Sequence, residues 1–229
     1  MSLYFPIKTF YVAVFVLFAF NAFSQSSSEK DSVSSNISYE NNRQRFGFFS
    51  MGYHNPNTTG DNFMGDGLQG KSGFDFKFQM YVYKQFFLGL YTGASYFDVK
   101  DVELVGNYKK STLNESYLYI GYEFLPADRM RLGALASFYG DSRFKNYYSK
   151  TSNVYQVDKG NLNTFGVYFN YELSSHFMIY IDYAYRTTKT EINTSTELNQ
   201  FFEKGKYHSL GIGLIFALGS KDVLSTFID

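Results

Sequence analysis

The sequence of 229 residues has no cysteine, no tryptophan and only three prolines, and 18% of its residues are charged. The absence of cysteine excludes disulfide scaffolds, cysteine-ligated zinc, iron–sulfur clusters, thiol catalysis and lipoprotein acylation. Basic and acidic residues number 21 each, so the basic excess of a nucleic-acid-binding domain is missing and no nucleic-acid partner is expected.

Motifs for cofactors and metals are also missing. No phosphate-binding loop or dinucleotide fingerprint occurs. The oxygen-rich segment 61–67 does not have the alternating acids and distal Glu of a calcium-binding loop. We therefore predict no cofactor and no metal site.

The chain is instead rich in aromatic side chains, with 26 Phe and 22 Tyr making up 21% of its residues. Less than about a tenth is usual in a globular chain. After residue 44, no segment repeats apolar residues with the 3.6-residue period of a helix, whereas a period of two recurs along the chain. These features indicate an all-β fold with large apolar faces.

The first 24 residues have the pattern of an export signal. Lys8 is followed by the apolar run Phe10–Phe20, which is too short for a helix that crosses about 30 Å of hydrocarbon. Small residues at 22 and 24 predict cleavage before residue 25. Residues 25–44 are rich in Ser and Asn and poor in apolar residues, so we expect a disordered lead-in to the folded domain at 45–218.

Eight segments with alternating apolar and polar residues predict eight strands. Phe74, Phe76 and Phe78, for example, alternate with Asp75 and Lys77. The segments are Arg45–Tyr53, Phe74–Val82, Phe87–Phe97, Thr112–Phe124, Met130–Gly140, Thr164–Leu173, Phe177–Thr187 and His208–Leu218.

Connections between these segments are alternately long and short. Three have about two to four residues, whereas the other four span roughly 54–71, 98–111, 142–160 and 189–206. In an antiparallel meander, alternate connections lie at opposite ends. This asymmetry is typical of outer-membrane barrels, which have short periplasmic turns and long external loops. The sequence predicts a closed eight-stranded antiparallel up-and-down transmembrane β-barrel, with a short periplasmic tail at 219–229.

Alternation does not say which face points outward, because a soluble lipocalin-like barrel has the same period with its faces reversed. Here the polar face is rich in Gly, Tyr and Ser and carries few of the Lys and Glu residues of a water-facing surface. The apolar face places aromatics near both strand ends, as at two membrane interfaces. We therefore expect the apolar face to contact lipid.

The predicted inward face carries a set of opposite charges. In a lumen filled by side chains, such groups must satisfy one another, which favours a structural plug; an ion path is the alternative. The set consists of Asp75, Lys77, Glu123, Arg129, Arg131, Glu172, Asp182 and Arg186, with Tyr81, Tyr91, Tyr119, Tyr168 and Tyr180 in the same space.

Aromatic residues in the predicted loops are candidates for partner binding, because aromatic anchors dominate interfaces. A loop-capping role is the alternative. The candidates are Phe63, Tyr147, Tyr148, Tyr155, Phe201 and Phe202.

With its export signal, eight strands and long alternate loops, residues 45–218 resemble the small outer-membrane barrels of OmpX and OmpA-transmembrane type, especially the "outer membrane protein beta-barrel" set abundant in Bacteroidota. The last strand is similar to the family's assembly signal at Ser209, Gly211, Leu214 and Phe216. The resemblance implies recognition by the barrel-assembly machinery. It also implies contact with outer-membrane lipid and lipopolysaccharide, and an envelope protein complex as a candidate partner.

Some barrels of this size modify lipid A with a membrane-facing Ser and His on one strand. His208 lacks that spacing. Ser50 and His54 could approach His208 where the first and last strands meet, which leaves a lipid A-modifying enzyme as one alternative and a narrow channel as another. We expect a non-enzymatic membrane anchor that displays loops for adhesion, envelope integrity or assembly.

Overall fold

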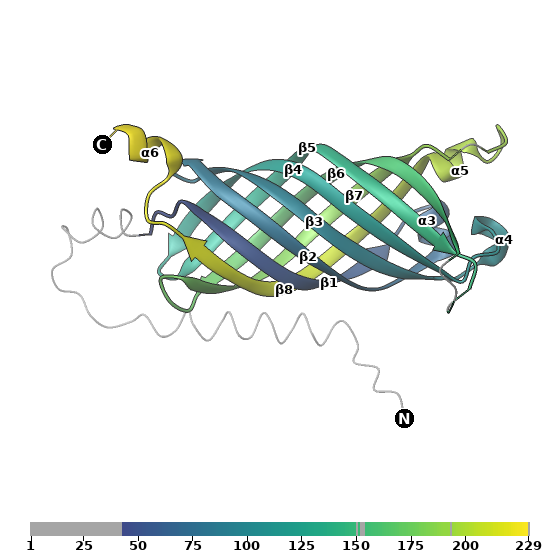
Figure 1. The fold of residues 1–229 in the computed structure, drawn as a ribbon, viewed down its shortest axis with the longest axis horizontal. Coiled ribbons are helices and arrows are strands. Elements are labelled where there is room, and N and C mark those ends of the chain that lie inside the picture. Colours follow the sequence, from purple (N-terminus) through teal and green to yellow (C-terminus); the bar gives the residue numbers. More distant parts are fainter. Residues whose placement is uncertain (1–42, 150, 152–153, 193, 229) are drawn as a thin grey trace, which may run out of the picture. The chain divides into compact units, whose positions relative to one another are not determined.

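The structure, a computed structural model, describes residues 43–149, 151, 154–192 and 194–228. Eight antiparallel strands form a closed barrel in sequence order, with β1 paired to both β2 and β8 (Figure 1). The predicted fold class is confirmed. The strands are β1 Gly47–Thr58, β2 Leu68–Tyr83, β3 Phe86–Val99, β4 Lys110–Ala127, β5 Met130–Tyr147, β6 Tyr155–Glu172, β7 Phe177–Thr190 and β8 Lys204–Leu218.

The two ends of the barrel differ, and we name them by their connections. The turn end carries the tight connections after β2, β4 and β6, where Lys84 and Arg129 adopt left-handed φ values of 50° and 63°. The loop end carries three short helices, α3 (Phe63–Gly67), α4 (Val102–Val105) and α5 (Asn199–Glu203) (Figure 1). The predicted export signal and nearly all of the predicted lead-in lie outside the described residues.

None of the helices among the described residues is long and apolar enough to cross a membrane.

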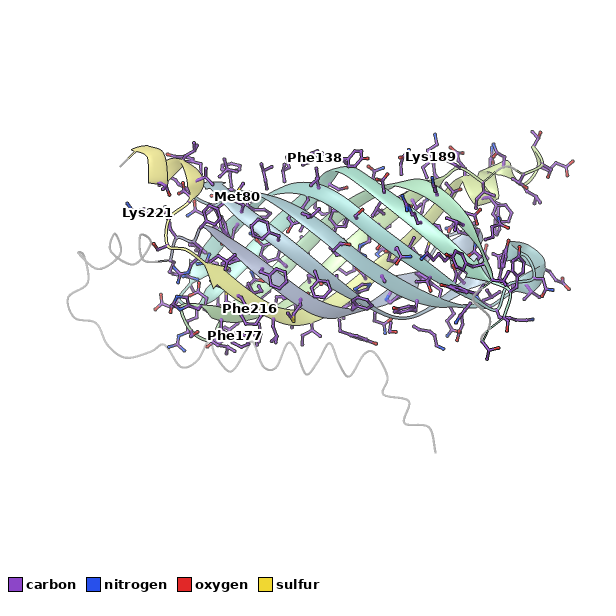
Figure 2. The ribbon with its side chains drawn as sticks, viewed as in Figure 1. Met80, Phe138, Phe177, Lys189, Phe216 and Lys221 are labelled. Carbon is purple, nitrogen blue, oxygen red and sulfur yellow. The ribbon has the colours of Figure 1, made fainter. Side chains whose placement is uncertain are left out.

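Side chains alternate between the lumen and the exterior as the sequence predicts. On β2, Phe74 and Phe76 are 45% and 41% exposed, whereas Asp75 between them is buried. Figure 2 shows Phe138 on β5 directed away from the barrel. Because the exterior is apolar and the lumen polar, this is the arrangement of a barrel in lipid rather than of a soluble barrel.

The strands extend further toward the loop end than the sequence predicts, and the loops are correspondingly shorter. β5 continues to Tyr147 and β6 begins at Tyr155, so only 148–154 connect them instead of 142–160. A strand needs about 9–11 residues to cross the bilayer, and β4, β5 and β6 each have 18. Beyond the membrane the apolar alternation stops while backbone pairing continues, which explains the difference.

A β-bulge interrupts β5 at Phe138. Tyr119 pairs with Ser137 and Leu118 pairs with Tyr139, so Phe138 has no residue opposite it on β4. The pairing of β5 with β6 shifts in the same region. An extra residue reverses which positions face inward, and Phe144 beyond the bulge is therefore buried.

The tail after β8 folds against the turn end. Asp222 is buried; it accepts hydrogen bonds from the backbone N–H of Lys84 and from Ser225 at the start of α6 (Val223–Ile228). Burial alone would raise the pKa of Asp222, but these hydrogen bonds to the carboxylate outweigh it and hold the pKa below its usual value. The tail is therefore attached to the β2–β3 turn rather than free.

Candidate functional site

The candidate site is the lumen, and its turn end is filled by a network of two arginines and two glutamates. Arg131 on β5 bonds Glu123 on β4 through Nη1 at 2.6 Å and also reaches Glu172 on β6. Arg43, which precedes β1, lies 3.2 Å from Glu172 and donates to the carbonyl oxygens of Ala127 and Met130 at 2.9 and 2.8 Å. We call Arg43, Glu123, Arg131 and Glu172 the turn-end network.

Two sequence expectations at this end are wrong. Arg129 does not point inward; it is an exposed residue of the β4–β5 turn. Arg43, assigned to the disordered lead-in, is buried and holds the second cationic position near Glu172. The alternation of even and odd positions along a strand could not predict this, because Arg43 lies outside any strand and enters the lumen from the end of the barrel.

A central network joins β2 and β7 across the lumen. Lys77 on β2 contacts Asp182 on β7 and lies 3.4 Å from Asp75. Tyr180 donates to Asp75 at 3.2 Å, and the Lys77 ammonium lies 4.3 Å from the centre of the Tyr180 ring. The inward charges of β2 and β7 therefore neutralise one another, although four strands separate β2 from β7 in the chain.

His54 adds a buried relay to this network that the sequence analysis did not identify. Its Nδ1 lies 2.8 Å from Asp75 Oδ2, and its Nε2 lies 2.8 Å from Ser95 Oγ. Serine, histidine and aspartate in this order form the arrangement of a nucleophile, its base and an orienting acid. Here the three residues are only 0–2% exposed. A closed position of this kind gives an acyl substrate no access, so the relay is suited to holding strands β1, β2 and β3 together.

The loop-end network is formed by Glu115 on β4, Arg186 on β7 and Tyr207 on β8. Arg186 Nη1 lies 2.8 Å from Glu115 Oε2 and donates to the Tyr207 hydroxyl at 3.0 Å. The guanidinium also lies 4.6 Å from the centre of the Tyr91 ring. Arg186 was among the predicted inward charges, but Glu115 was not. Its odd position on β4, shared with Glu123, is a signal that could have identified it.

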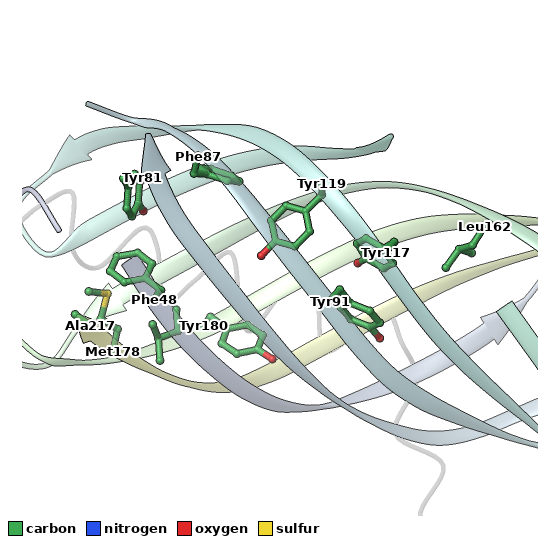
Figure 3. Close-up of a cluster of buried hydrophobic side chains, with 11 residues drawn as sticks. Phe48, Tyr81, Phe87, Tyr91, Tyr117, Tyr119, Leu162, Met178, Tyr180 and Ala217 are labelled. Atoms are coloured by element: carbon green, nitrogen blue, oxygen red, sulfur yellow. The ribbon is translucent and has the colours of Figure 1, made fainter. Parts of the chain in front are cut away.

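Aromatic rings fill the space between the three networks (Figure 3). Tyr91 and Tyr117 stack with ring centres 4.3 Å apart, and Phe48 packs edge-on against Tyr81 at 5.2 Å. A Cβ at Gly89 would overlap the Tyr119 ring, so this close approach requires glycine.

A cavity remains inside the lumen. It is lined by Ser50, Lys77, Gln79 and Tyr180 among others, and its volume of about 30 Å³ gives room for only about one or two water molecules.

The candidate partner-binding aromatics divide into buried and exposed residues. Phe63 is 5% exposed and stacks on Phe202 with ring centres 6.0 Å apart, which fits the loop-capping alternative rather than partner binding. Phe201 contacts Phe202 and is half-buried. Phe63 belongs to a second apolar cluster that caps the lumen at the loop end, with Met64, Leu68, Phe97, Leu113, Phe144 and Tyr207.

Tyr147 and Tyr155 lie on strands rather than in a loop, as opposite residues of β5 and β6 with ring centres 5.2 Å apart. Tyr155 is 42% exposed and Tyr148 is 48% exposed. The exposed candidates are therefore gathered at the loop-end tip of the β5–β6 hairpin.

The four residues of the predicted assembly signal all lie on β8. Ser209 and Gly211 face the lumen, whereas Leu214 and Phe216 are exposed on the outer face, at 38% and 40%. Leu214 pairs with Met51 across the closure between β1 and β8.

The proposed seam between Ser50, His54 and His208 does not form. Ser50 and His54 are buried in the lumen, whereas His208 is on the outer face and its Nδ1 hydrogen-bonds the Tyr183 hydroxyl. Opposite sides of the barrel wall separate the groups, so a lipid A-modifying site composed of these residues is excluded. Within the described residues, no group of three or more His, Asp or Glu side chains could hold a metal ion.

Comparison with known proteins places the fold in a class. No protein-family model and no curated protein matches the chain. Neisserial surface protein A superposes with a TM-score of 0.55 at 9% identity, over 74% of this chain and 96% of that one. The closed eight-stranded architecture and the apolar exterior are those of the small outer-membrane β-barrels.

Two further solved structures are similar. OprG from Pseudomonas aeruginosa has a TM-score of 0.47 at 16% identity, over 77% of this chain and 98% of that one. Ail, the attachment invasion locus protein of Yersinia pestis, has a TM-score of 0.46 at 10% identity, over 76% and 99%. At these identities the likeness is one of fold.

Proposed function

We propose that this protein is a non-enzymatic outer-membrane barrel that does not conduct and acts as a rigid anchor for its loop end. The observation that supports this function is the filled lumen. Three networks of buried polar and charged groups, separated by stacked aromatic rings, occupy it from Glu172 at one end to Glu115 at the other. Each charge of the three lumen networks contacts a group of opposite charge, so an ion that entered would have to displace a paired group.

The charge networks therefore have a structural role in this proposal. Paired charges in a nearly dry lumen cross-link strands that share no backbone hydrogen bonds. Lys77 with Asp182 connects β2 to β7, and Glu115 with Arg186 connects β4 to β7. Such cross-links fix the shape of the barrel cross-section. A rigid anchor requires this, because a fixed barrel holds its loop end in one arrangement.

Conductance across a planar bilayer tests the proposal. We expect no steady current from the inserted full-length protein over a range of voltages. The protein is delivered to the bilayer from lipid vesicles. A sample of these vesicles is run on a gel, where slower migration of the protein after heating verifies that it was folded. Steady single-channel steps from the parent protein would contradict the anchor and favour the narrow channel.

The loop end supplies the contact surface of this anchor. Tyr148 and Tyr155 are exposed at the tip of the β5–β6 hairpin, together with Val154, which is 63% exposed. We propose that these residues contact another envelope protein or an external surface, because exposed aromatics are typical interface anchors. Gentle extraction of the tagged protein should recover a stoichiometric companion that a Tyr148→Ser/Tyr155→Ser variant loses and a Phe138→Ser variant retains. Loss from both variants, or from neither, would count against this surface.

A further inference from the structure

A pocket lies at the loop end, against the apolar cluster that caps the lumen. Its volume is about 320 Å³, within the range of about 300–1,000 Å³ that is usual for small-molecule sites. Residues of α3, α4 and α5 line it together with the loop-end parts of β5 and β6 (Figure 1). Phe63 and Phe144 of the capping cluster form part of its wall. Leu104 and Leu198 also line it and are 42% and 50% exposed, so the pocket is accessible from outside the barrel.

One wall of this pocket is polar and comes from β5 and β6. The register places Phe144 opposite Asp158 and Asn146 opposite Gln156. Beyond the bulge the even positions of β5 turn inward, so these side chains share the lumen side of the sheet. Asn146 Nδ2 donates to Asp158 Oδ2 at 2.6 Å, and Gln156 Nε2 donates to Asp158 Oδ1 at 2.9 Å. The two amides therefore hold the Asp158 carboxylate in place at the pocket wall.

The carboxylate of Asp158 has neutral donors but no cation beside it. None of the ion pairs among the described residues includes Asp158. The lysines of the same strands occupy outward positions: Lys145 lies 5.3 Å from the centre of the Tyr155 ring, and Lys159 is exposed.

This carboxylate is consequently ready to accept a positive group. A carboxylate has about four acceptor positions, and the two amides use only one on each oxygen of Asp158. Asp158 is half-buried, and a charge that is partly removed from water beside apolar side chains is unfavourable until it is paired.

We propose that the pocket binds a small amphipathic cation. Its ammonium group pairs with Asp158, and its apolar body packs against Phe63 and Phe144. The carboxylate selects such a ligand over a neutral molecule of the same shape, whereas the apolar wall selects it over a cation that has no apolar part. The capping cluster closes the pocket toward the lumen, so binding requires no passage through the barrel. The inference goes beyond the proposed anchor function, because it does not depend on a partner at the tip of the β5–β6 hairpin.

Titration of the full-length protein in detergent micelles with three probes tests the site. The probes are phenylethylammonium, the neutral phenylethanol and methylammonium, and amide shifts in nuclear magnetic resonance spectra report their affinities and position. Micelles without protein give the blank for partition of each probe. We expect phenylethylammonium to bind at least about fivefold more tightly than either other probe, the scale of a partly exposed ion pair. The shifts should centre on the loop-end parts of β5 and β6.

Asp158→Asn separates the charge of the pocket from its shape. This variant should bind phenylethylammonium about fivefold more weakly than the parent and bind phenylethanol equally well. Asp98→Asn is the matched control, since it removes a carboxylate at the same end of the barrel that is already paired with Lys71 at 2.8 Å. It should bind all three probes as the parent does. Slower gel migration after heating verifies that each variant is folded.

The comparison of probes on the parent protein needs no variant and can overturn the site by itself. Equal affinities for phenylethylammonium and phenylethanol would exclude the role of the carboxylate. Methylammonium binding as tightly as phenylethylammonium would exclude the role of the apolar wall. Equal losses in Asp158→Asn and Asp98→Asn would also contradict the site. Each of these results would leave the anchor proposal intact, because that proposal is tested by conductance.

Discussion

At the scale of residues, the stability of the lumen depends on charges that have partners. Arg186 is 2% exposed, and its guanidinium lies against Glu115 and the Tyr91 ring. Removing a charge from water costs several kcal/mol, which a well-placed partner offsets. An arginine left without its carboxylate would therefore cost much more free energy than the loss of one exposed ion pair.

Glu115→Ala should lower the free energy of unfolding by about 3–5 kcal/mol, because it leaves Arg186 buried and unpaired. Urea unfolding of the protein in detergent or lipid vesicles measures this change. Glu203→Ala is the control, since its pair with exposed Lys189 at 3.5 Å should be worth less than about 1 kcal/mol. Similar effects of the two substitutions would show that the loop-end network does not carry the expected stability.

At the scale of elements, the bulge in β5 changes which of its positions face the lumen. Up to Ser137 its odd residues face the lumen, whereas beyond the bulge Ser142 and Phe144 do so at even positions. An even–odd prediction continued through Phe138 would place Phe144 outward. The bulge thus allows β5 to contribute a buried ring to the apolar cluster at the loop end.

Deleting Phe138 should leave a folded barrel, because the pairs on either side of it, Tyr119 with Ser137 and Leu118 with Tyr139, then follow one another without a gap. Deleting Phe165 is the matched control. It is an outward phenylalanine that pairs with Ala136 and Tyr185. Its deletion would therefore move the lumen-facing side chains of half of β6 to the outer face. Gel mobility with and without heating reports both outcomes. A Phe138 deletion that fails to fold while Phe138→Ala folds would show that the bulge itself is required.

At the scale of the whole molecule, closure of the sheet determines how the protein behaves in a membrane. β1 pairs with β8 from Gly47 with Leu218 to Thr58 with Tyr207, so the sheet has no open edge. In lipid an unpaired backbone group costs several kcal/mol. The lumen networks add cross-links that a detergent must break before the barrel opens.

The unheated protein should therefore migrate faster than the boiled protein in a detergent gel, because a closed barrel stays compact until heat opens it. It should also require detergent for extraction from membranes. Identical mobility before and after boiling, or a protein freely soluble without detergent, would contradict the closed barrel with a lipid-facing exterior.

The sequence by itself determined the number of strands, their order and, within the regular parts of the predicted strands, the face that a side chain occupies. Alternation of period two is a local property, and on β2 it correctly assigned Phe76 outward and Asp75 inward. The asymmetry between turns and loops is also local, since it depends only on the spacing of the segments. The strand ends at the loop end were not determined, because there the residues on both faces are polar while the backbone stays paired.

Only the tertiary structure decided which lumen groups meet. His54 contacts Asp75 and Ser95 from 21 and 41 positions away, and Arg186 meets Glu115 across the lumen at a separation of 71. These distances follow from the stagger of all eight strands, which no single segment encodes. The prediction placed Arg129 in the lumen and Arg43 outside it, and the structure shows the reverse. Alternation assigns a face only within a strand, whereas entry of a side chain from the end of the barrel depends on the closed shape of the barrel.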